Sequence, residues 1–293
     1  MTDMQGSTEA LVSVRNLTRT FDVRGGQFGQ SRSQVHALQD VSFDVFRGET
    51  LSIVGESGSG KSTLGMSLLQ LTRPTSGSVW YRGKDIVKNT AAQNRAMRRH
   101  LQIVFQDPFS TLNPRATVGS AIALPLLHHG LATRATVRDR VHAILSDVGL
   151  GALFENHYPH ELSGGQAQRV AIGRAIACEP EFIVCDEAIS ALDVSVQAQI
   201  INLLVDLQEK HGLTYLFIAH DLSVVRHISD RVAVMKGGRI VEIDAPQKLF
   251  TDPQHHYTRT LIAATPVFEA RSKLFAGMSV PERPAPSKLD RGS

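Results

Sequence analysis

The chain has 293 residues, of which 42% are hydrophobic and 20% are charged, a composition typical of a soluble globular protein with a sizeable core. Lysine and arginine outnumber aspartate and glutamate by 31 to 28, an excess of three that is too small to favour nucleic acid as a partner. No apolar stretch approaches the roughly 18 residues of a membrane-spanning helix, and the N-terminus lacks the pattern of a signal peptide. We therefore expect a cytoplasmic protein that serves a membrane, if it does so, from the surface.

The first third of the chain carries strand signals interrupted by one helix. Residues 11–21 alternate polar and apolar side chains, and further strand signals run from 35 to 55. A polar, glycine-rich insert at 24–34 separates them, and we expect it to be a mobile hairpin connection. The apolar spacing becomes helical over 55–71, is stopped by the sequence PTSG, and returns to strand over 76–86.

The rest of the chain alternates helices with short buried strands. The pattern over 108–177 is mainly helical, and the apolar run 182–187 predicts a strand that ends in two carboxylates. An amphipathic helix follows, with Asp193 at its N-cap and Gly212 just past its end. Three more strands are predicted, at 213–220, 231–235 and 239–243. This alternation predicts an α/β fold with a mostly parallel sheet and a helical insert between its halves.

The two cysteines, Cys178 and Cys185, lie in a segment that is predicted to be buried. Their spacing matches no zinc or iron–sulfur pattern. We expect two core thiols in a reducing compartment, without a disulfide framework.

The sequence GESGSGKST matches the P-loop pattern G-x-x-x-x-G-K-[ST] through Gly55, Gly60, Lys61 and Ser62. Glycines let the backbone wrap around phosphate oxygens with its N–H groups inward, the lysine supplies a positive charge, and the hydroxyl can bind Mg²⁺. The motif lies between a predicted strand and a predicted helix, which is the context that it requires. The nucleotide-binding residues predicted here are Gly55, Glu56, Ser57, Gly58, Ser59, Gly60, Lys61, Ser62 and Thr63.

The sequence FIVCDE supplies an acidic partner for this loop. An apolar strand that ends in Asp186 places a carboxylate at the edge of the sheet where phosphates and metal ions bind. Such an aspartate holds Mg²⁺, usually through water. The adjacent Glu187 points elsewhere and is predicted to polarise the attacking water.

A second phosphate-binding signal stands at residues 162–166, LSGGQ, directly before a predicted helix. The series of P-loop, LSGGQ, apolar run ending DE, SALD and isolated histidine resembles the ATPase subunits of ABC transporters. The resemblance implies an ABC-type nucleotide-binding domain of the P-loop NTPase fold, with a RecA-like core, an antiparallel β subdomain and a helical subdomain. It also implies a head-to-tail dimer, in which the LSGGQ of each subunit completes the ATP site of the other. The residues that would do so are Ser163, Gly164, Gly165 and Gln166.

Four further positions acquire roles from this resemblance. Gln106 in VFQDP resembles the glutamine that reaches Mg²⁺ and water and relays the nucleotide state to the membrane subunits. Asp193 in SALD resembles the residue that crosses to the opposite site, although it also serves as a helix cap. His220 resembles the histidine that contacts the γ-phosphate, and Phe21 the aromatic that stacks on adenine, a position that core packing equally explains. The implied cofactors are ATP and Mg²⁺, with Ser62, Gln106 and Asp186 at the metal and Glu187, His220 and Gln106 in catalysis.

Three segments, at 55–77, 105–118 and 190–235, resemble the oligopeptide, dipeptide and nickel branch of importers. Within that branch, the sequence around KSTLG resembles the F-type member. The sequence HHYTRTLIAATP at 255–266 is similar to the C-terminal motif of that branch. We thus expect a flexible tail over 1–10, the ATPase domain over 11–250 and an importer-type extension over 251–293 that ends in a flexible tail. The implied partners are a second, D-type ATPase chain, two permease subunits and, indirectly, an extracytoplasmic binding protein, at the cytoplasmic face of the inner membrane.

Several alternatives stay open at this point. Nickel or glutathione could replace peptides as the cargo, because an ATPase subunit does not contact what is transported. A soluble ABC ATPase that acts on nucleic acid is disfavoured by the weak charge excess and the single uninterrupted cassette. A regulatory module without activity would tolerate loss of Glu187 or His220, and both are present.

Overall fold

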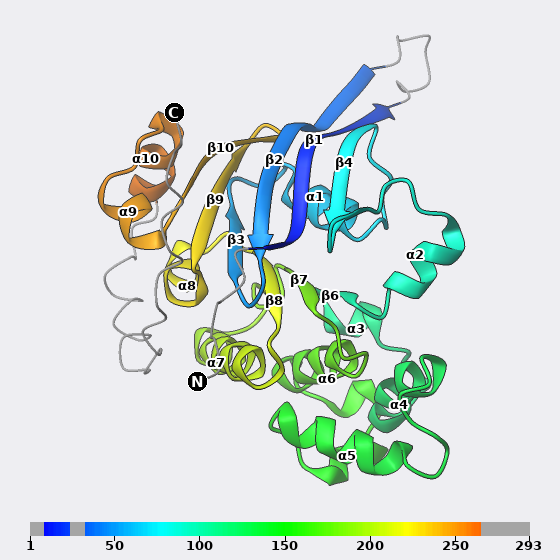
Figure 1. Cartoon of the computed structure of the whole chain (residues 1–293). Helices are drawn as coiled ribbons and strands as arrows, with labels where there is room; N and C mark the ends of the chain where they lie inside the picture. Colours follow the sequence, from blue (N-terminus) through cyan, green and yellow to red (C-terminus); the bar gives the residue numbers. More distant parts are fainter. Residues whose placement is uncertain (1–8, 24–32, 265–293) are drawn as a thin grey trace, which may run out of the picture.

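The computed structural model describes residues 9–23 and 33–264 and arranges them as two β-sheets with helices between and around them (Figure 1). The expected flexible tail over 1–10, the mobile insert at 24–34 and the tail at the C-terminus lie largely or wholly outside the described residues. Within the described ranges, no helix combines the length and the apolar character that crossing a membrane requires.

The larger sheet has six strands in the order β10-β9-β3-β8-β7-β6. Four of its five pairings are parallel and only β9 with β10 is antiparallel, which confirms the predicted, mostly parallel sheet. Three of its strands, β3, β7 and β8, are buried along their whole length, as expected for a parallel sheet covered on both faces. The strands are β3 (Thr50–Val54), β6 (Leu101–Phe105), β7 (Phe182–Asp186), β8 (Thr214–Ile218), β9 (Arg231–Lys236) and β10 (Arg239–Asp244).

The smaller sheet is antiparallel and has the order β2-β1-β4-β5, in agreement with the expected antiparallel β subdomain. In Figure 1 its long blue strands lie beside β9 and β10 and above β6, β7 and β8 of the larger sheet. Its strands are β1 (Ala10–Val23), β2 (Ser33–Phe46), β4 (Ser76–Tyr81) and β5 (Lys84–Asp85).

Helix α1 (Lys61–Leu68) packs in the core that the two sheets share. Its Leu64 and Leu68 are fully buried in the same cluster as apolar side chains of both sheets. The helix lies close to the larger sheet because of Gly65, where a Cβ atom would come within 2.9 Å of the Val184 side chain. The helix that begins at the P-loop is therefore held rigidly by packing on its sides.

The predicted helical region between β6 and β7 consists of four α-helices and two 3₁₀ turns (green in Figure 1). It shares one continuous apolar cluster with the helices on the outer face of the larger sheet. The elements of the region are α3 (Pro108–Thr111), α4 (Val118–His128), α5 (Val137–Asp147), η1 (Ala152–Asn156), η2 (Pro159–Glu161) and α6 (Gly164–Ile176). The outer face carries α7 (Val194–His211) and α8 (Leu222–Ile228).

Five elements were not predicted from the sequence: the short helices α8, α9 (Pro246–Thr251) and α10 (His256–Ala263), and also helix α2 (Ala91–Met97) and strand β6. Helix α2 has no buried residue, so its sequence lacks the apolar period of an amphipathic helix; its one local signal is the capping box of Thr90 and Gln93. Strand β6 has only two of five residues buried, because it is the edge strand of the larger sheet. The omissions of α2 and β6 follow from the absence of a strong apolar pattern.

The chain continues past the larger sheet into α9 (Pro246–Thr251) and α10 (His256–Ala263), which lie beside β9 and β10 (orange in Figure 1). The expected boundary at 251 falls on the last residue of α9. Leu249 of α9 and Tyr257 of α10 are both buried in the same apolar cluster as the sheet. The first part of the predicted extension is thus packed onto the domain.

Candidate nucleotide-binding site

The P-loop joins the end of β3 to the start of α1, as the motif requires. Two of its glycines are needed because neighbouring backbone leaves no room for a side chain. A Cβ atom on Gly55 would lie 2.1 Å from the carbonyl oxygen of Met235, and one on Gly60 would lie 2.3 Å from that of Ala37. Gly60 also has a φ of +105°, in a region that L side chains rarely adopt. The loop is therefore a close-fitting backbone cradle.

Lys61 is only 5% exposed and lies under this loop. Its Nζ donates hydrogen bonds of 2.8 Å to the carbonyl oxygens of Gly55 and Glu56. Burial lowers the pKa of Lys61, while the nearby carboxylates of Glu187 and Asp186 act in the opposite direction. A buried cation at the start of a helix, among inward-facing backbone groups, suits a phosphate group.

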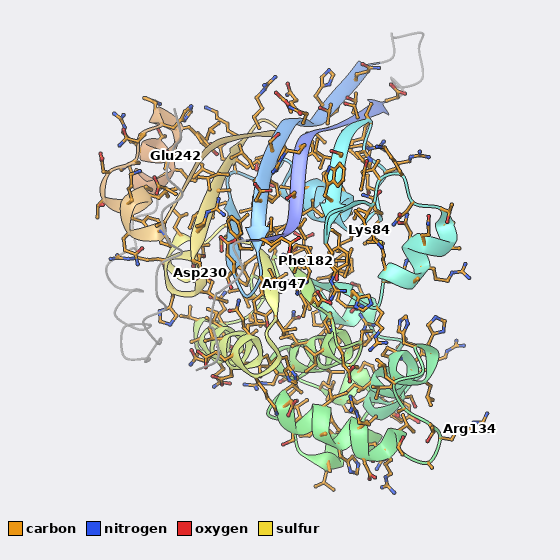
Figure 2. The ribbon with its side chains drawn as sticks, viewed as in Figure 1. Arg47, Lys84, Arg134, Phe182, Asp230 and Glu242 are labelled. Carbon is orange, nitrogen blue, oxygen red and sulfur yellow. The ribbon has the colours of Figure 1, made fainter. Side chains whose placement is uncertain are left out.

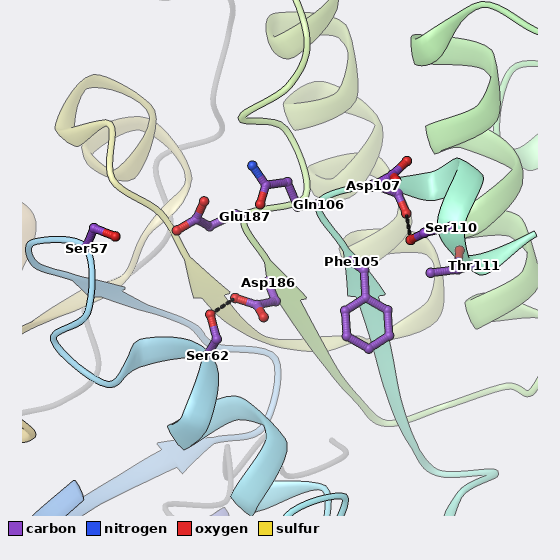
Figure 3. Close-up of a pocket in the computed structure, with 9 residues that line it drawn as sticks. All are labelled: Ser57, Ser62, Phe105, Gln106, Asp107, Ser110, Thr111, Asp186 and Glu187. Carbon is purple, nitrogen blue, oxygen red and sulfur yellow. Dashed lines mark hydrogen bonds between the residues drawn. The ribbon is translucent and has the colours of Figure 1, made fainter. Parts of the chain in front are cut away.

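Ser62 and Asp186 meet at the base of the cradle, where the Ser62 hydroxyl donates a 2.9 Å hydrogen bond to Asp186 Oδ1 (Figure 3). Asp186 is 8% exposed, and burial raises its pKa, although the bond from Ser62 partly offsets this. A hydroxyl and a carboxylate are oxygen ligands of the kind that Mg²⁺ prefers. Together with the buried Ser59 Oγ, which has no hydrogen-bond partner among the described residues, they fit a magnesium–phosphate group.

A cavity of about 500 Å³ lies above these groups. It is lined from the P-loop, from the end of β7 and from the turn after β6, so that Gln106 and Glu187 face the same space as Asp186 (Figure 3). The sequence predicted five of the nine lining residues, Ser57, Ser62, Gln106, Asp186 and Glu187. It did not assign the other four, Phe105, Asp107, Ser110 and Thr111, to the nucleotide site.

Asp107 had a recognisable signal. Its side chain accepts a 2.9 Å hydrogen bond from the N–H of Phe109 and begins helix α3, in which Pro108 is the first residue. An aspartate followed by proline at a helix start is a common N-terminal pattern. The short helix holds this wall of the cavity.

Glu187 leaves the strand in a left-handed conformation, with a φ of 50°. Its N–H donates a 3.0 Å hydrogen bond to the carbonyl oxygen of Ile218, which fixes this unusual backbone geometry. The Glu187 carboxylate nevertheless lines the same cavity as that of Asp186, so the prediction that it points elsewhere stays a prediction. His220 Nδ1 lies 4.0 Å from Glu187 Oε2, and its side chain is 59% exposed. The acid and the imidazole share a small neighbouring cavity.

The LSGGQ residues lie at the start of α6, and none of them belongs to the cavity lining given above. Ser163 and Gln166 form a capping box: the Ser163 hydroxyl accepts from the Gln166 N–H, and the Gln166 side chain accepts from the Ser163 N–H. Gly165 allows α6 to approach α7, because a Cβ atom there would lie 2.5 Å from the Val196 side chain. Ser163 is exposed. These residues build a helix start that lies outside the lining of the chain's own P-loop cavity.

The two remaining predicted residues lie outside the cavity as well. Asp193 caps α7 by accepting from the Val196 N–H at 3.0 Å, and a hydrogen bond from the Ser195 hydroxyl lowers its pKa. Phe21 is partly exposed on β1, with the guanidinium of Arg19 4.3 Å from its ring centroid. Contact of either residue with nucleotide stays a prediction.

Known proteins resemble this chain both in sequence and in fold. Residues 38–190 match the family model described as "ABC transporter". The chain is 45% identical to the oligopeptide transport ATP-binding protein AppF of Bacillus subtilis, over 97% of this chain and 87% of AppF. It is 48% identical to the glutathione import ATP-binding protein GsiA of Pectobacterium atrosepticum, over 95% of this chain but only 45% of GsiA. The chain thus spans less than half the length of that relative.

Solved structures give the same result. The ATP-binding cassette MJ0796, solved as a dimer in a post-hydrolysis state with ADP and Pi, is 32% identical with a TM-score of 0.70, covering 80% of this chain and 98% of that one. The protein cbiO1 of Clostridium perfringens, part of an ABC transporter complex, has a TM-score of 0.72 at 26% identity and covers 92% of this chain and 99% of that one. By its fold, its nucleotide site and its relatives, the chain belongs to the ABC transporter family.

Proposed function

We propose that this chain is the ATP-hydrolysing subunit of an importer of the ABC transporter family that takes up peptides. One observation carries the proposal: the P-loop, the paired carboxylates and Gln106 converge on one cavity, while LSGGQ lies outside the lining of that cavity. Two cooperating ATPase subunits need two features in each chain. One is a cavity that binds nucleotide, and the other is a separate helix N-terminus that can contact the phosphates bound by the partner.

Each residue of the site has a part in hydrolysis. The loop N–H groups and Lys61 hold the phosphates and offset their charge, because the buried ammonium is directed at the loop from below. Bound Mg²⁺, held by the Ser62 hydroxyl and by Asp186 and Gln106, would neutralise further charge on the phosphate oxygens. Glu187 accepts a proton from the attacking water, and His220 beside it helps to orient that water. Positioning and electrostatics account for most of such catalysis.

The exposed N-terminus of α6 serves the nucleotide of another ATPase subunit. Ser163, Gly164, Gly165 and Gln166 would contact the γ-phosphate bound at a partner's P-loop, and Asp193 and Phe21 would add contacts across the interface and to adenine. MJ0796, which this chain resembles over 80% of its length, was solved as a dimer. That likeness supports a head-to-tail pairing. The resemblance of the sequence to F-type importer ATPases favours a different, D-type chain as the partner.

Similarity to AppF, over 87% of that protein, supports peptides as the cargo. Glutathione, itself a tripeptide, is the favoured second cargo because relatives of this chain at 48% to 50% identity are glutathione import proteins. We place the chain at the cytoplasmic face of the inner membrane, with two permease subunits and an extracytoplasmic binding protein.

Light scattering on purified Glu187→Gln protein, with and without MgATP, tests the shared-site model. The variant is expected to bind MgATP and, if two copies can complete each other's sites, to change from monomer to dimer. The matched control is Glu187→Gln combined with Ser163→Arg. It retains the P-loop, but the bulky side chain at the start of α6 prevents closure.

If the Glu187→Gln protein binds MgATP but dimerises only with a second ATPase chain, the chain belongs to a heterodimeric importer. A protein that binds no MgATP would refute the ATPase assignment. The cargo is tested separately, by deleting the gene in the source bacterium and measuring uptake of a radiolabelled tripeptide and of glutathione. Unchanged uptake of both would exclude the peptide assignment, and membrane fractions without the protein would favour the nucleic-acid alternative.

A further inference from the structure

The C-terminal helix α10 contacts the P-loop directly. The N–H of Glu56, the second residue of the loop, donates a 3.1 Å hydrogen bond to the hydroxyl of Tyr257. Tyr257 is only 4% exposed, although it lies 201 residues away along the chain. Burial raises the pKa of Tyr257, and the hydrogen bond from the Glu56 N–H offsets this only in part, so the hydroxyl stays neutral at physiological pH.

The Glu56 peptide is constrained from both sides. In the peptide that joins Gly55 to Glu56, the N–H donates to Tyr257 and the carbonyl oxygen accepts a 2.8 Å hydrogen bond from Lys61 Nζ. A shift of this peptide would therefore also move the cation that is directed at the phosphates. Further along the loop, the N–H of Gly238, in the turn between β9 and β10, donates a 2.9 Å hydrogen bond to the carbonyl oxygen of Ser59. The loop is braced at two backbone atoms by the layer formed by β9, β10 and α10.

Tyr257 is itself held in place by a carboxylate on β10. Glu242, labelled beside the orange helices in Figure 2, accepts hydrogen bonds from the N–H groups of Gln254 and His255, at 2.8 Å and 3.0 Å, and from the hydroxyl of Thr258. Thr258 is fully buried. Three donors on one carboxylate fix the start of α10, and with it the orientation of Tyr257. The Nζ of Lys236 lies over the ring of Tyr257, 4.5 Å from its centroid.

We propose that Tyr257 is a positioning residue for the nucleotide. Its hydroxyl holds the start of the P-loop in the conformation that receives the phosphates, so that docking of α10 sets the affinity for ATP. The physical basis is preorganisation: a loop that is already ordered loses less conformational freedom when the ligand binds. The proposal rests on the proposed ATP site, and it makes the C-terminal segment part of that site.

The test is isothermal titration of MgATP and MgADP into the full chain and into Tyr257→Phe. Loss of one hydrogen bond is expected to weaken both ligands about fivefold. The KM for ATP should rise by the same factor while kcat stays unchanged, because Tyr257 contacts neither the γ-phosphate nor the attacking water. The matched control is Tyr215→Phe, which removes another buried hydroxyl, bonded to the carbonyl oxygen of Leu204 at 3.0 Å in the adjacent core. It should bind both nucleotides as the unaltered chain does.

Glu242→Gln provides a second, independent measurement. It loosens the start of α10 with Tyr257 intact, and it should weaken MgATP two- to fivefold. Adding Tyr257→Phe to it should then have less effect than in the unaltered chain, because both changes act through the same contact. Additive effects of the two changes would overturn the proposal.

The outcomes separate this proposal from the proposed function. If the unaltered chain binds no MgATP, both fail. If it binds MgATP and Tyr257→Phe binds with the same Kd and KM, the ATP site stands and the positioning role is refuted. A fall in kcat without a rise in Kd would also refute it, because it would show that Tyr257 acts on the chemical step and not on loop order.

Discussion

The carboxylate of Glu187 lies 4.0 Å from the imidazole of His220, although each follows a different strand. The two strands, β7 and β8, are parallel neighbours, so their carboxyl ends meet at one edge of the sheet. The hydrogen bond from the Glu187 N–H to the Ile218 carbonyl oxygen joins the two strand ends. Acid and imidazole are thereby placed together beside the P-loop cavity.

Replacing Glu187 by glutamine should nearly abolish ATP turnover and leave nucleotide binding intact. The amide matches the carboxylate in shape but cannot accept the proton of the attacking water, a loss that typically costs about 10²- to 10⁴-fold in rate. Single-turnover hydrolysis of radiolabelled ATP, beside titration of MgATP, separates the two effects. Hydrolysis at the normal rate would remove Glu187 from its assigned role.

Gly55→Ala should destabilise the fold, because the new Cβ would lie 2.1 Å from the Met235 carbonyl oxygen. Overpacking against backbone, together with strain, is expected to lower the free energy of unfolding by about 2–4 kcal/mol. Gly48→Ala is the control: φ is +70° there but no atom lies within 4 Å, so only the backbone strain of about 1 kcal/mol applies. Urea denaturation measures both. Equal decreases in the free energy of unfolding would show that the P-loop backbone shifts to accommodate the new Cβ atom.

Glu242 should make the protein sensitive to acid. Burial acts to raise its pKa, but the hydrogen bonds from Thr258, Gln254 and His255 outweigh it, and the net pKa lies below the ordinary value of a glutamate. A depressed pKa in the folded state stabilises the fold above the unfolded-state value, and this contribution disappears as the pH falls through the folded-state value.

Glu242→Gln should accordingly melt below the unaltered chain at pH 7, and the difference should shrink as the pH falls below about 4.5. Thermal melts between pH 7 and pH 3.5 measure it. Glu209→Gln, at an exposed position on α7, serves as the control and should show no such trend. A difference in melting temperature that stays constant with pH would contradict the role of the carboxylate.

The two cysteines should be inert in the folded protein. Both are buried, and burial raises the pKa of Cys178 to about 11 and that of Cys185 to about 12. At pH 8, roughly a thousandth or less of either thiol would be in the reactive thiolate form. Titration with a thiol reagent should find two groups in urea and none in buffer. Rapid reaction of one thiol in buffer would show that its segment opens.

Much of this site could be predicted from the chain alone, because its motifs are local. The P-loop needs glycines and a lysine at fixed spacing between a strand and a helix, and Asp186 and Glu187 end an apolar run. Periodicity likewise predicted the buried strands and α7, with Asp193 as its cap, but it missed α2 and β6, which bury too little apolar surface to show a period.

Only the tertiary structure decided which of these local pieces meet. It brings Gln106, Ser62 and Glu187 to one cavity and leaves Ser163 to Gln166 outside it, because strand order and helix packing are set by contacts far apart in sequence. The bond between Tyr257 and Glu56 has no sequence signal at all. Spacing along a chain encodes the geometry of a single turn, whereas a contact across 201 residues depends on how every intervening element packs.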